Sequence, residues 1–258
     1  MKVRAPHPWG VNIAEARAIQ ETLRGRVVTS PSPELPLPPR TVAGIDVSCP
    51  GGTGRALAGV VVMSLPGMEV IERRSANLPL TFPYVPGFLS FREGEAVTEA
   101  LGKVRSPVDV FLFDGQGVCH PRRFGLASHI GVILDRPAVG CAKSLLMGKH
   151  REPAAARGSR CRILQGKEVL GCALRTRHGV RPVYVSVGHL VDLPAALKIV
   201  LACGRGFRIP EPLREAHRWV TELGRERRWN GPSAAGVRAR SLGGGGESFR
   251  DGREVGTG

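Results

Sequence analysis

The sequence predicts an α/β protein built on one mixed β-sheet that is flanked by helices. Strand-like runs at residues 41–47, 57–65 and 69–78 follow one another with only turns between them, which is typical of three antiparallel strands with the last at an edge. Residues 108–114 and 138–146 are further strand-like runs with a helical pattern between them, and a helical crossover makes the strands that it joins parallel. This order of elements is that of a ribonuclease-H-like sheet.

The other segments are assigned by the spacing of their apolar residues and by their turn signals. Residues 147–162 are basic and polar, which predicts an excursion from the sheet. The chain divides into an N-terminal helix with a proline-rich connector (1–40), one α/β domain (41–224), and a basic Gly/Arg-rich tail (225–258) that is predicted to be disordered. Helices are expected at 13–23, from Ser90 onward, and at 124–134, 193–203 and 212–223, and further strands at 168–175 and 182–187.

The charge and cysteine content limit the class of protein. The formal net charge is +15, which favours a polyanionic partner such as nucleic acid over a surface that is charged only for solubility. The six cysteines are scattered without a C-x-x-C pair, which argues against a disulfide framework or a structural zinc site and suits a reducing compartment. No secretory leader and no membrane-length apolar run is visible, so we expect a cytoplasmic monomer with no membrane partner.

Two aspartates end strands that are expected to be neighbours. Asp46 lies near the end of the first predicted strand, and Asp114 ends the fourth at an Asp-Gly turn. A right-handed crossover places these strands side by side, so both carboxylates fall at the same end of the sheet. Two such charges repel unless a cation lies between them. The alternative for Asp114 is that it caps the helix that follows.

A third carboxylate lies on the face that a helix turns toward the sheet. With about 100° per residue, Val97, Ala100 and Val104 all fall within about 40° of Glu93, so Glu93 is central in the apolar stripe. A carboxylate in that position needs a partner. The alternative is a capping box, in which Glu93 bonds back to the backbone of Ser90.

Asp46, Glu93 and Asp114 form a set of oxygen ligands suited to Mg²⁺, with Mn²⁺ as a substitute. Metal ions held in this way can activate water and polarise a phosphodiester, and the basic body supplies a grip on the nucleic-acid backbone. His217 lies on the flank of the last helix, where a histidine can be a ligand, a proton shuttle or a plain surface residue.

Four blocks of the sequence resemble one family, the endonuclease V group of deoxyinosine-directed nucleases. The second and third blocks are long and specific, and the resemblance covers residues 41 to 223. The departures are the long tail and the variations Val85 and Cys119, which do not touch a predicted metal ligand. The blocks are TVAGIDVS (41–48), PYVPGFLSFRE (83–93), DGQG (114–117) with HPRRFG (120–125), and PVYVSVGH (182–189).

The resemblance implies a ribonuclease-H-like fold and a DNA-repair activity. Members hydrolyse, with Mg²⁺, the second phosphodiester on the 3′ side of deoxyinosine in double- or single-stranded DNA, and leave 3′-hydroxyl and 5′-phosphate ends. By the match of motifs, Asp46, Glu93 and Asp114 would hold the metal ions. His217 falls beside that site, and Lys143 falls near the scissile phosphate.

The resemblance also implies how the lesion is held. The loop from Pro83 to Pro86 matches the family's wedge, in which Tyr84 fills the space that the extruded base leaves; as an alternative, Tyr84 is a plain surface aromatic. An inosine pair is weak, which lowers the cost of extruding the base. Residues that match the lining of the base pocket, with His120 assigned more loosely, are Gly87, Leu89, Gly115, Leu126 and His120.

Three other functions compete with this hypothesis. A cysteine hydrolase could be built on Cys119 and His120, although neighbouring residues rarely form a nucleophile–base pair. A protein that binds modified bases without cutting would not need three acids, because they repel phosphate. An endoribonuclease that acts on inosine in RNA keeps the same site, since recognition of the 2′-hydroxyl leaves no short motif.

Overall fold

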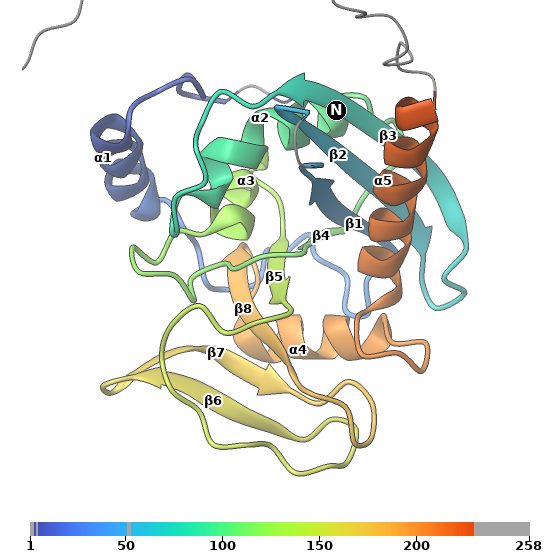
Figure 1. Ribbon diagram of the computed structural model, residues 1–258. Helices are drawn as coiled ribbons and strands as arrows, with labels where there is room; N and C mark the ends of the chain where they lie inside the picture. The colour runs from blue at the N-terminus through green and yellow to red at the C-terminus, as the bar shows by residue number, and fades with distance from the viewer. Residues whose placement is uncertain (1–2, 4, 51–52, 230–258) are drawn as a thin grey trace, which may run out of the picture.

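The computed structural model describes residues 3, 5–50 and 53–229, which fold around one eight-stranded mixed sheet (Figure 1). The strand order is β3-β2-β1-β4-β5-β8-β7-β6. The strands are β1 (Thr41–Ser48), β2 (Arg55–Ser64), β3 (Val70–Pro79), β4 (Val110–Phe113), β5 (Ala138–Ala142), β6 (Arg160–Gln165), β7 (Glu168–Leu174) and β8 (Val183–His189). The helices are α1 (Ile13–Arg24), α2 (Leu89–Gly102), α3 (Leu126–Leu134), α4 (Leu193–Ala202) and α5 (Glu211–Trp229).

The pairing of the central strands confirms the predicted topology. β1, β2 and β3 form an antiparallel meander with β3 at the edge, and β4 lies parallel to β1 with Phe113 opposite Ile45. β5 continues the parallel part, and β8, β7 and β6 add an antiparallel part. This register places the C-terminal ends of β1 and β4 next to each other in the sheet.

Helices cover both faces of the sheet. Residues of α1, α2 and α3 share a core with one face, where Ile45 and Phe113 are buried. Residues of α4 and α5 share a second core with the opposite face, where Val42 and Leu112 are buried. Because side chains alternate along a strand, Asp46 and Asp114 follow the second set and belong to the face that α5 covers.

Two glycines allow α5 to lie directly on the strands. A Cβ atom at Gly44 would stand 2.1 Å from the carbonyl oxygen of Pro212, and one at Gly59 would stand 2.5 Å from a Val220 methyl group. Larger side chains here would push α5 off β1 and β2. The close contact therefore sets how near His217, about one and a half turns along α5 from Pro212, comes to the end of β1.

Several predicted boundaries are wrong in detail. β6 lies at the end of the stretch that we predicted to be an excursion, and β5 ends at Ala142 rather than 146, so Lys143 directly follows the strand. α5 continues to Trp229, past the predicted start of the tail at 225. The rest of the predicted disordered tail, residues 230–258, lies outside the described residues.

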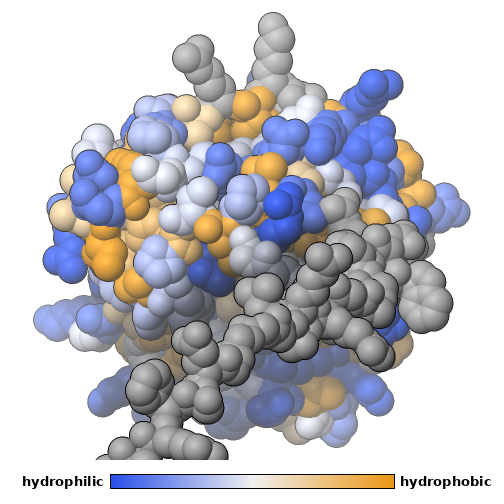
Figure 2. Space-filling model, turned by 45° about the horizontal axis from the view of Figure 1, so that its top comes forward, coloured by the Kyte–Doolittle hydropathy of each residue, from blue (hydrophilic) through white to orange (hydrophobic). Residues whose placement is uncertain are grey.

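The surface is mixed in character. On the face seen in Figure 2, apolar residues lie in small groups separated by hydrophilic ones. In the part of the chain that the structure describes, no helix has the length and apolar character needed to cross a membrane.

Candidate active site

Asp46 and Asp114 lie side by side at the ends of neighbouring strands. Asp46 is the sixth residue of β1, and Asp114 directly follows β4. The backbone N–H of Asp114 donates to the carbonyl oxygen of Ile45 at 3.1 Å, which continues the parallel ladder by one residue. The register thus confirms the prediction that both carboxylates lie at the same end of the sheet.

Each aspartate contacts a cationic or titratable side chain from another element. Nδ1 of His217 lies 2.7 Å from Oδ2 of Asp46, and Nζ of Lys143 forms an ion pair with Asp114. Asp114 does not cap α3, whose N-cap residue is Gly125 without a side-chain bond. α5 and the segment after β5 therefore each bring one side chain, His217 and Lys143, to the carboxylates.

Burial and repulsion between neighbouring acids raise the pKa values of two carboxyl groups in the site. Burial, together with the charges of Asp46 and Asp114, raises the pKa of Glu93 to about 8. Burial also raises the pKa of Asp114, with a further contribution from Asp46, although Lys143 acts in the opposite direction. Lys143 pays a desolvation cost too, but its bond to Asp114 outweighs it and raises the pKa of Lys143.

Glu93 is not engaged in a capping box. α2 begins at Leu89, its N-cap residue Phe88 makes no side-chain bond, and Ser90 lies inside the first turn with a hydroxyl that has no partner. The alternative that explained Glu93 by local capping is therefore wrong. The influence of Asp46 and Asp114 on the pKa of Glu93 places the three acids in one electrostatic environment.

The donor set fits a hard divalent cation. Among the described residues, no three His, Cys, Asp or Glu side chains are already spaced as ligands of one ion. Asp46 and Asp114 instead contact His217 and Lys143. Of the three carboxyl groups, Glu93 and Asp114 have raised pKa values. A divalent cation that takes oxygen ligands would stabilise their charged forms.

A pocket of about 260 Å³ opens directly beside Asp114 and Lys143. Tyr84 stands at its edge with 71% of its surface exposed. Pro83, which we predicted to belong to the same wedge, is exposed and is not among the residues that line the pocket. The predicted substrate-binding residues that do line it are Tyr84, Pro86, Gly87, Leu89, Gly115, His120 and Leu126.

Three side chains converge on the carbonyl oxygen of Gly87, behind this pocket. Nε2 of Gln20 donates to it at 3.1 Å, Nε2 of His120 lies at 3.0 Å, and the guanidinium of Arg122 also donates to it. Arg122 donates as well to the amide oxygen of Gln20 and lies 4.1 Å from the centre of the Phe88 ring. We call these three side chains the Gly87 clamp.

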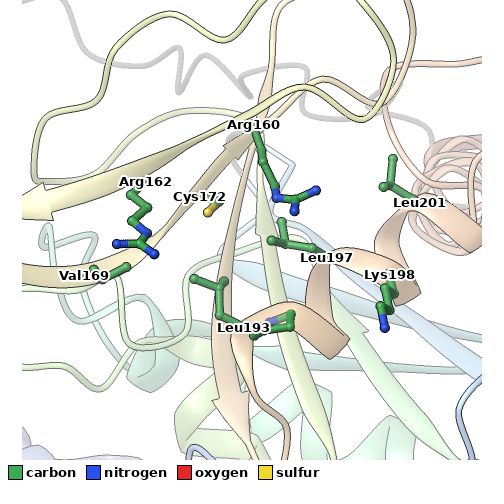
Figure 3. A pocket seen from close by; sticks show the side chains of 9 residues that line it. Arg160, Arg162, Val169, Cys172, Leu193, Leu197, Lys198 and Leu201 are labelled. Carbon is green, nitrogen blue, oxygen red and sulfur yellow. The ribbon is translucent and has the colours of Figure 1, made fainter.

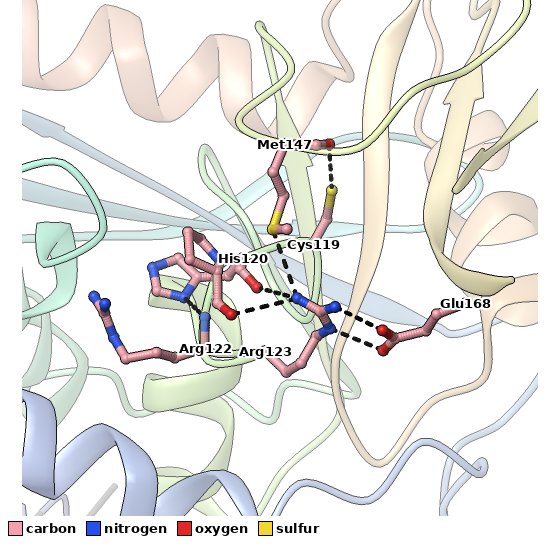
Figure 4. A network of polar contacts seen from close by, with 7 residues as sticks. Cys119, His120, Arg122, Arg123, Met147 and Glu168 are labelled. Atoms are coloured by element: carbon pink, nitrogen blue, oxygen red, sulfur yellow. Dashed lines mark hydrogen bonds and ion pairs between the residues drawn. The ribbon is translucent and has the colours of Figure 1, made fainter. Parts of the chain in front are cut away.

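Sequence reasoning missed two members of the Gly87 clamp. Gln20 is fully buried, and its place four residues after Ala16 and three before Leu23 puts it in the buried stripe of α1. A polar residue at such a position was the available signal. Nothing in the sequence singles out Arg122. Its neighbour Arg123 has the same chemistry but turns away to pair with Glu168 (Figure 4).

Cys119 and His120 do not form a nucleophile–base pair. The thiol of Cys119 faces the carbonyl oxygen of Met147 (Figure 4), while the His120 ring contacts Gly87 and the N–H of Arg122. Burial raises the pKa of Cys119 to about 11 and lowers the pKa of His120 to about 4. A buried, protonated thiol beside a histidine with other partners does not support a cysteine hydrolase.

A separate groove of about 570 Å³ lies between α4 and the β6–β7 hairpin (Figure 3). Leu193, Leu197 and Leu201 contribute apolar surface, and Arg160 and Arg162 point into it from β6. It has no acidic residue in its lining and shares no residue with the pocket beside Asp114. This groove therefore is not a candidate for the same chemistry.

Comparison with known proteins shows which family the chain resembles. The family model described as Endonuclease V matches residues 21–218. Endonuclease V from a Nostoc species is 48% identical over 216 residues, which are 84% of this chain and 97% of that protein. The crystal structure of endonuclease V from Streptomyces avermitilis is 40% identical with a TM-score of 0.79, and covers 88% of this chain and 100% of its own.

A third relative was solved with nucleic acid bound. The endonuclease V of Ciona intestinalis, in complex with a 24mer DNA containing an inosine followed by a ribo-adenosine, is 30% identical with a TM-score of 0.74. The match covers 83% of this chain and 98% of that one. Taken with the site geometry and the family model, these similarities show that the chain belongs to the endonuclease V family and is an endonuclease.

Proposed function

We propose that this protein nicks DNA at the second phosphodiester on the 3′ side of deoxyinosine, with Mg²⁺ as the cofactor and Mn²⁺ as a substitute, and leaves 3′-hydroxyl and 5′-phosphate ends. The observation that supports it most is the position of Asp46 and Asp114 at adjoining strand ends, with a base-sized pocket opening beside Asp114. Asp46, Glu93 and Asp114 would hold the metal. Bound there, it would supply an activated water and neutralise charge on the phosphate.

The chain's own side chains would prepare the reaction. The ammonium group of Lys143 is held at the rim of the pocket by Asp114, where it can contact a phosphate oxygen. His217 is held by Asp46 on the exposed flank of α5, with 63% of its side chain exposed, so it can exchange a proton with solvent next to the carboxylates.

The loop before α2 would supply lesion recognition. An exposed tyrosine between prolines can stack in the gap that an extruded base leaves, and the weak inosine pair makes that extrusion less costly. The complex of the Ciona intestinalis relative with inosine-containing DNA supports this substrate. The Gly87 clamp would keep the loop in place while the base enters the pocket.

The test uses four matched oligonucleotides: DNA and RNA, each with one inosine or with adenosine at the same position. In Mg²⁺ we expect nicking of the inosine DNA at the second phosphodiester on the 3′ side of the inosine. The adenosine controls should stay intact, and a chelator should abolish the activity. Mapping of the product ends checks the position. Preferential cutting of inosine RNA would replace DNA by RNA in the proposal, and tight binding without any nicking would make the protein a reader of modified bases.

A further inference from the structure

Two residues that line the pocket beside Asp114 each carry a buried polar atom without a hydrogen-bond partner. Among the described residues, six buried side-chain nitrogen or oxygen atoms have no hydrogen-bond partner. Two of the six, Oγ of Ser90 and Oε1 of Gln116, belong to residues of this one pocket, and these residues are 1% and 8% exposed. Buried polar groups are normally satisfied, so a pocket that gathers two unsatisfied ones points to a ligand that bonds to them.

The orientation of the Gln116 amide is determined by its other bond. Nε2 of Gln116 donates to the carbonyl oxygen of Ser144 at 3.0 Å, and only the NH₂ end of an amide can donate to a carbonyl. The amide oxygen is therefore the unpartnered end. It can accept a hydrogen bond but cannot donate one.

The backbone that carries Gln116 is held in place on both sides. The carbonyl oxygen of Gln116 accepts from the N–H of Ala127 at 3.0 Å, and the N–H of Gly117 donates to the hydroxyl of Ser186 at 2.9 Å. A Cβ atom at Gly125 would stand 2.4 Å from the same carbonyl oxygen, so that α3 begins in direct contact with the turn. Such a turn can present a fixed acceptor to an incoming group.

We propose that Oε1 of Gln116 accepts the ring N–H of the extruded, deaminated base and makes Gln116 a specificity-determining residue. This inference rests on the proposed function. Deamination of adenine turns the ring nitrogen N1 from an acceptor into an N–H donor, and enzymes that extrude a base read this edge by hydrogen bonds. A fixed acceptor bonds to hypoxanthine at N1 and repels the N1 lone pair of adenine.

The test is a cycle of two proteins and two substrates. Wild type and Gln116→Met are compared on duplexes with one deoxyinosine or one deoxynebularine, a purine nucleoside whose N1 carries no hydrogen. In wild type, only inosine has an N1–H that can bond to Gln116. Met cannot accept this bond, so we expect the ratio of kcat/KM for inosine over nebularine to fall about tenfold in Gln116→Met. An unchanged ratio, with both substrates slowed equally, would overturn the inference.

Gln20→Met is the matched control. Gln20 is also a buried glutamine behind the same pocket, but its amide bonds to Gly87, Phe124 and Arg122 within the protein. Its loss should slow both substrates equally and leave the ratio unchanged; a fall in the ratio as large as that of Gln116→Met would overturn the inference.

A second variant covers the case that Gln116→Met does not fold. Gln116→Glu keeps an oxygen acceptor but loses the donor to Ser144, and we expect it to retain the preference for inosine. Loss of that preference in a folded Gln116→Glu would overturn the inference. A wild type that leaves the inosine duplex intact would instead overturn the proposed function, so the two failures are distinguishable.

Discussion

Glu93 links the metal-ligand hypothesis to a measurable property of the free protein. Burial and the charges of Asp46 and Asp114 raise its pKa to about 8, above the ordinary value of 4.5. Between these two values the folded state binds more protons than the unfolded state, so the free energy of unfolding falls as pH rises. The carboxylate form of Glu93 is therefore destabilising until a cation joins it.

We accordingly predict that metal-free wild type loses stability from pH 5 to pH 8, and that Glu93→Gln removes much of this slope. Denaturant unfolding of both proteins in chelator at several pH values measures it. Added Mg²⁺ should stabilise wild type more at pH 8 than at pH 6, because binding releases a proton. Parallel pH profiles for wild type and Glu93→Gln would show that Glu93 is not in a strained electrostatic environment.

Lys143 offers a second test at a single side chain. Lys143→Met leaves Asp114 without its ion pair and removes a positive charge from the rim of the pocket. We predict that single-turnover nicking of the inosine duplex slows by about a hundredfold. Lys149→Met, which removes an exposed lysine from the loop after the pocket, is the control and should nick at the wild-type rate. If Lys143→Met nicks as fast as Lys149→Met, Lys143 does not take part in the reaction.

Part of the site was predictable residue by residue and part was not. Asp46 lies near the end of a buried strand, Asp114 directly follows another, and Glu93 interrupts an apolar stripe, so each stands out against its local pattern. The opposite holds for Gln116 and Arg122, which lie in turns, where polar residues are expected. Their roles depend on which carbonyl oxygen each side chain reaches in the fold.

At the scale of elements, α1 contacts the loop that borders the pocket beside Asp114, although α1 lies outside the sheet. Gln20 of α1 and Arg122, from the segment between β4 and α3, meet on the carbonyl oxygen of Gly87, which has a positive φ of 82°. The Gly87 clamp thus joins two parts of the chain to the loop that carries Tyr84. It also ties α1 to the α/β part of the chain through hydrogen bonds of Gln20 to Gly87 and Phe124.

Weakening the Gly87 clamp should affect substrate binding more than the chemical step. We predict that Gln20→Met raises KM for the inosine duplex about tenfold while kcat changes little, because the loop loses its fixed position but the carboxylates keep theirs. Steady-state kinetics on one duplex measures this split. A fall in kcat at unchanged KM would contradict the role given to the clamp.

Arg123→Met is the matched control for the clamp. Arg123 adjoins Arg122, but its guanidinium pairs with Glu168 on the β7 side and donates to the backbone carbonyl of His120 rather than to Gly87 (Figure 4). Its loss should leave KM for the inosine duplex near the wild-type value. A KM as high as that of Gln20→Met would mean that any disturbance of this segment has the same effect.

The elements themselves were predictable where burial imposes a pattern. The β1–β3 meander and β4 were expected because their apolar runs and turn residues are strong. β6 was missed because it is an edge strand whose side chains are mostly exposed, with Ile163 as its one buried residue. Its sequence therefore has the composition of a loop, and only pairing with β7 makes it a strand.

At the scale of the whole molecule, charge should dominate affinity but not specificity. The net charge is +15, and residues 230–258 carry four arginines against three acids, so most of the positive charge belongs to the folded body. Phosphate contacts contribute to binding in proportion to the counterions that they release.

Truncation after Trp229 should therefore leave inosine-directed nicking intact. We predict that the slope of log affinity against log salt concentration changes by less than about one unit relative to the full chain. Fluorescence anisotropy with a labelled duplex at several salt concentrations measures the slope. A loss of turnover at saturating substrate would show that residues 230–258 take part in the reaction.

A paired measurement on Asp114→Ala tests whether Asp46, Glu93 and Asp114 together hold the metal for phosphodiester hydrolysis. Binding of the single-inosine duplex is measured by anisotropy in Ca²⁺, and nicking of the same duplex in Mg²⁺. We expect affinity within about threefold of wild type, because the phosphate contacts and the pocket remain, but no detectable nicking. Nicking at the wild-type rate in Mg²⁺ would contradict this expectation.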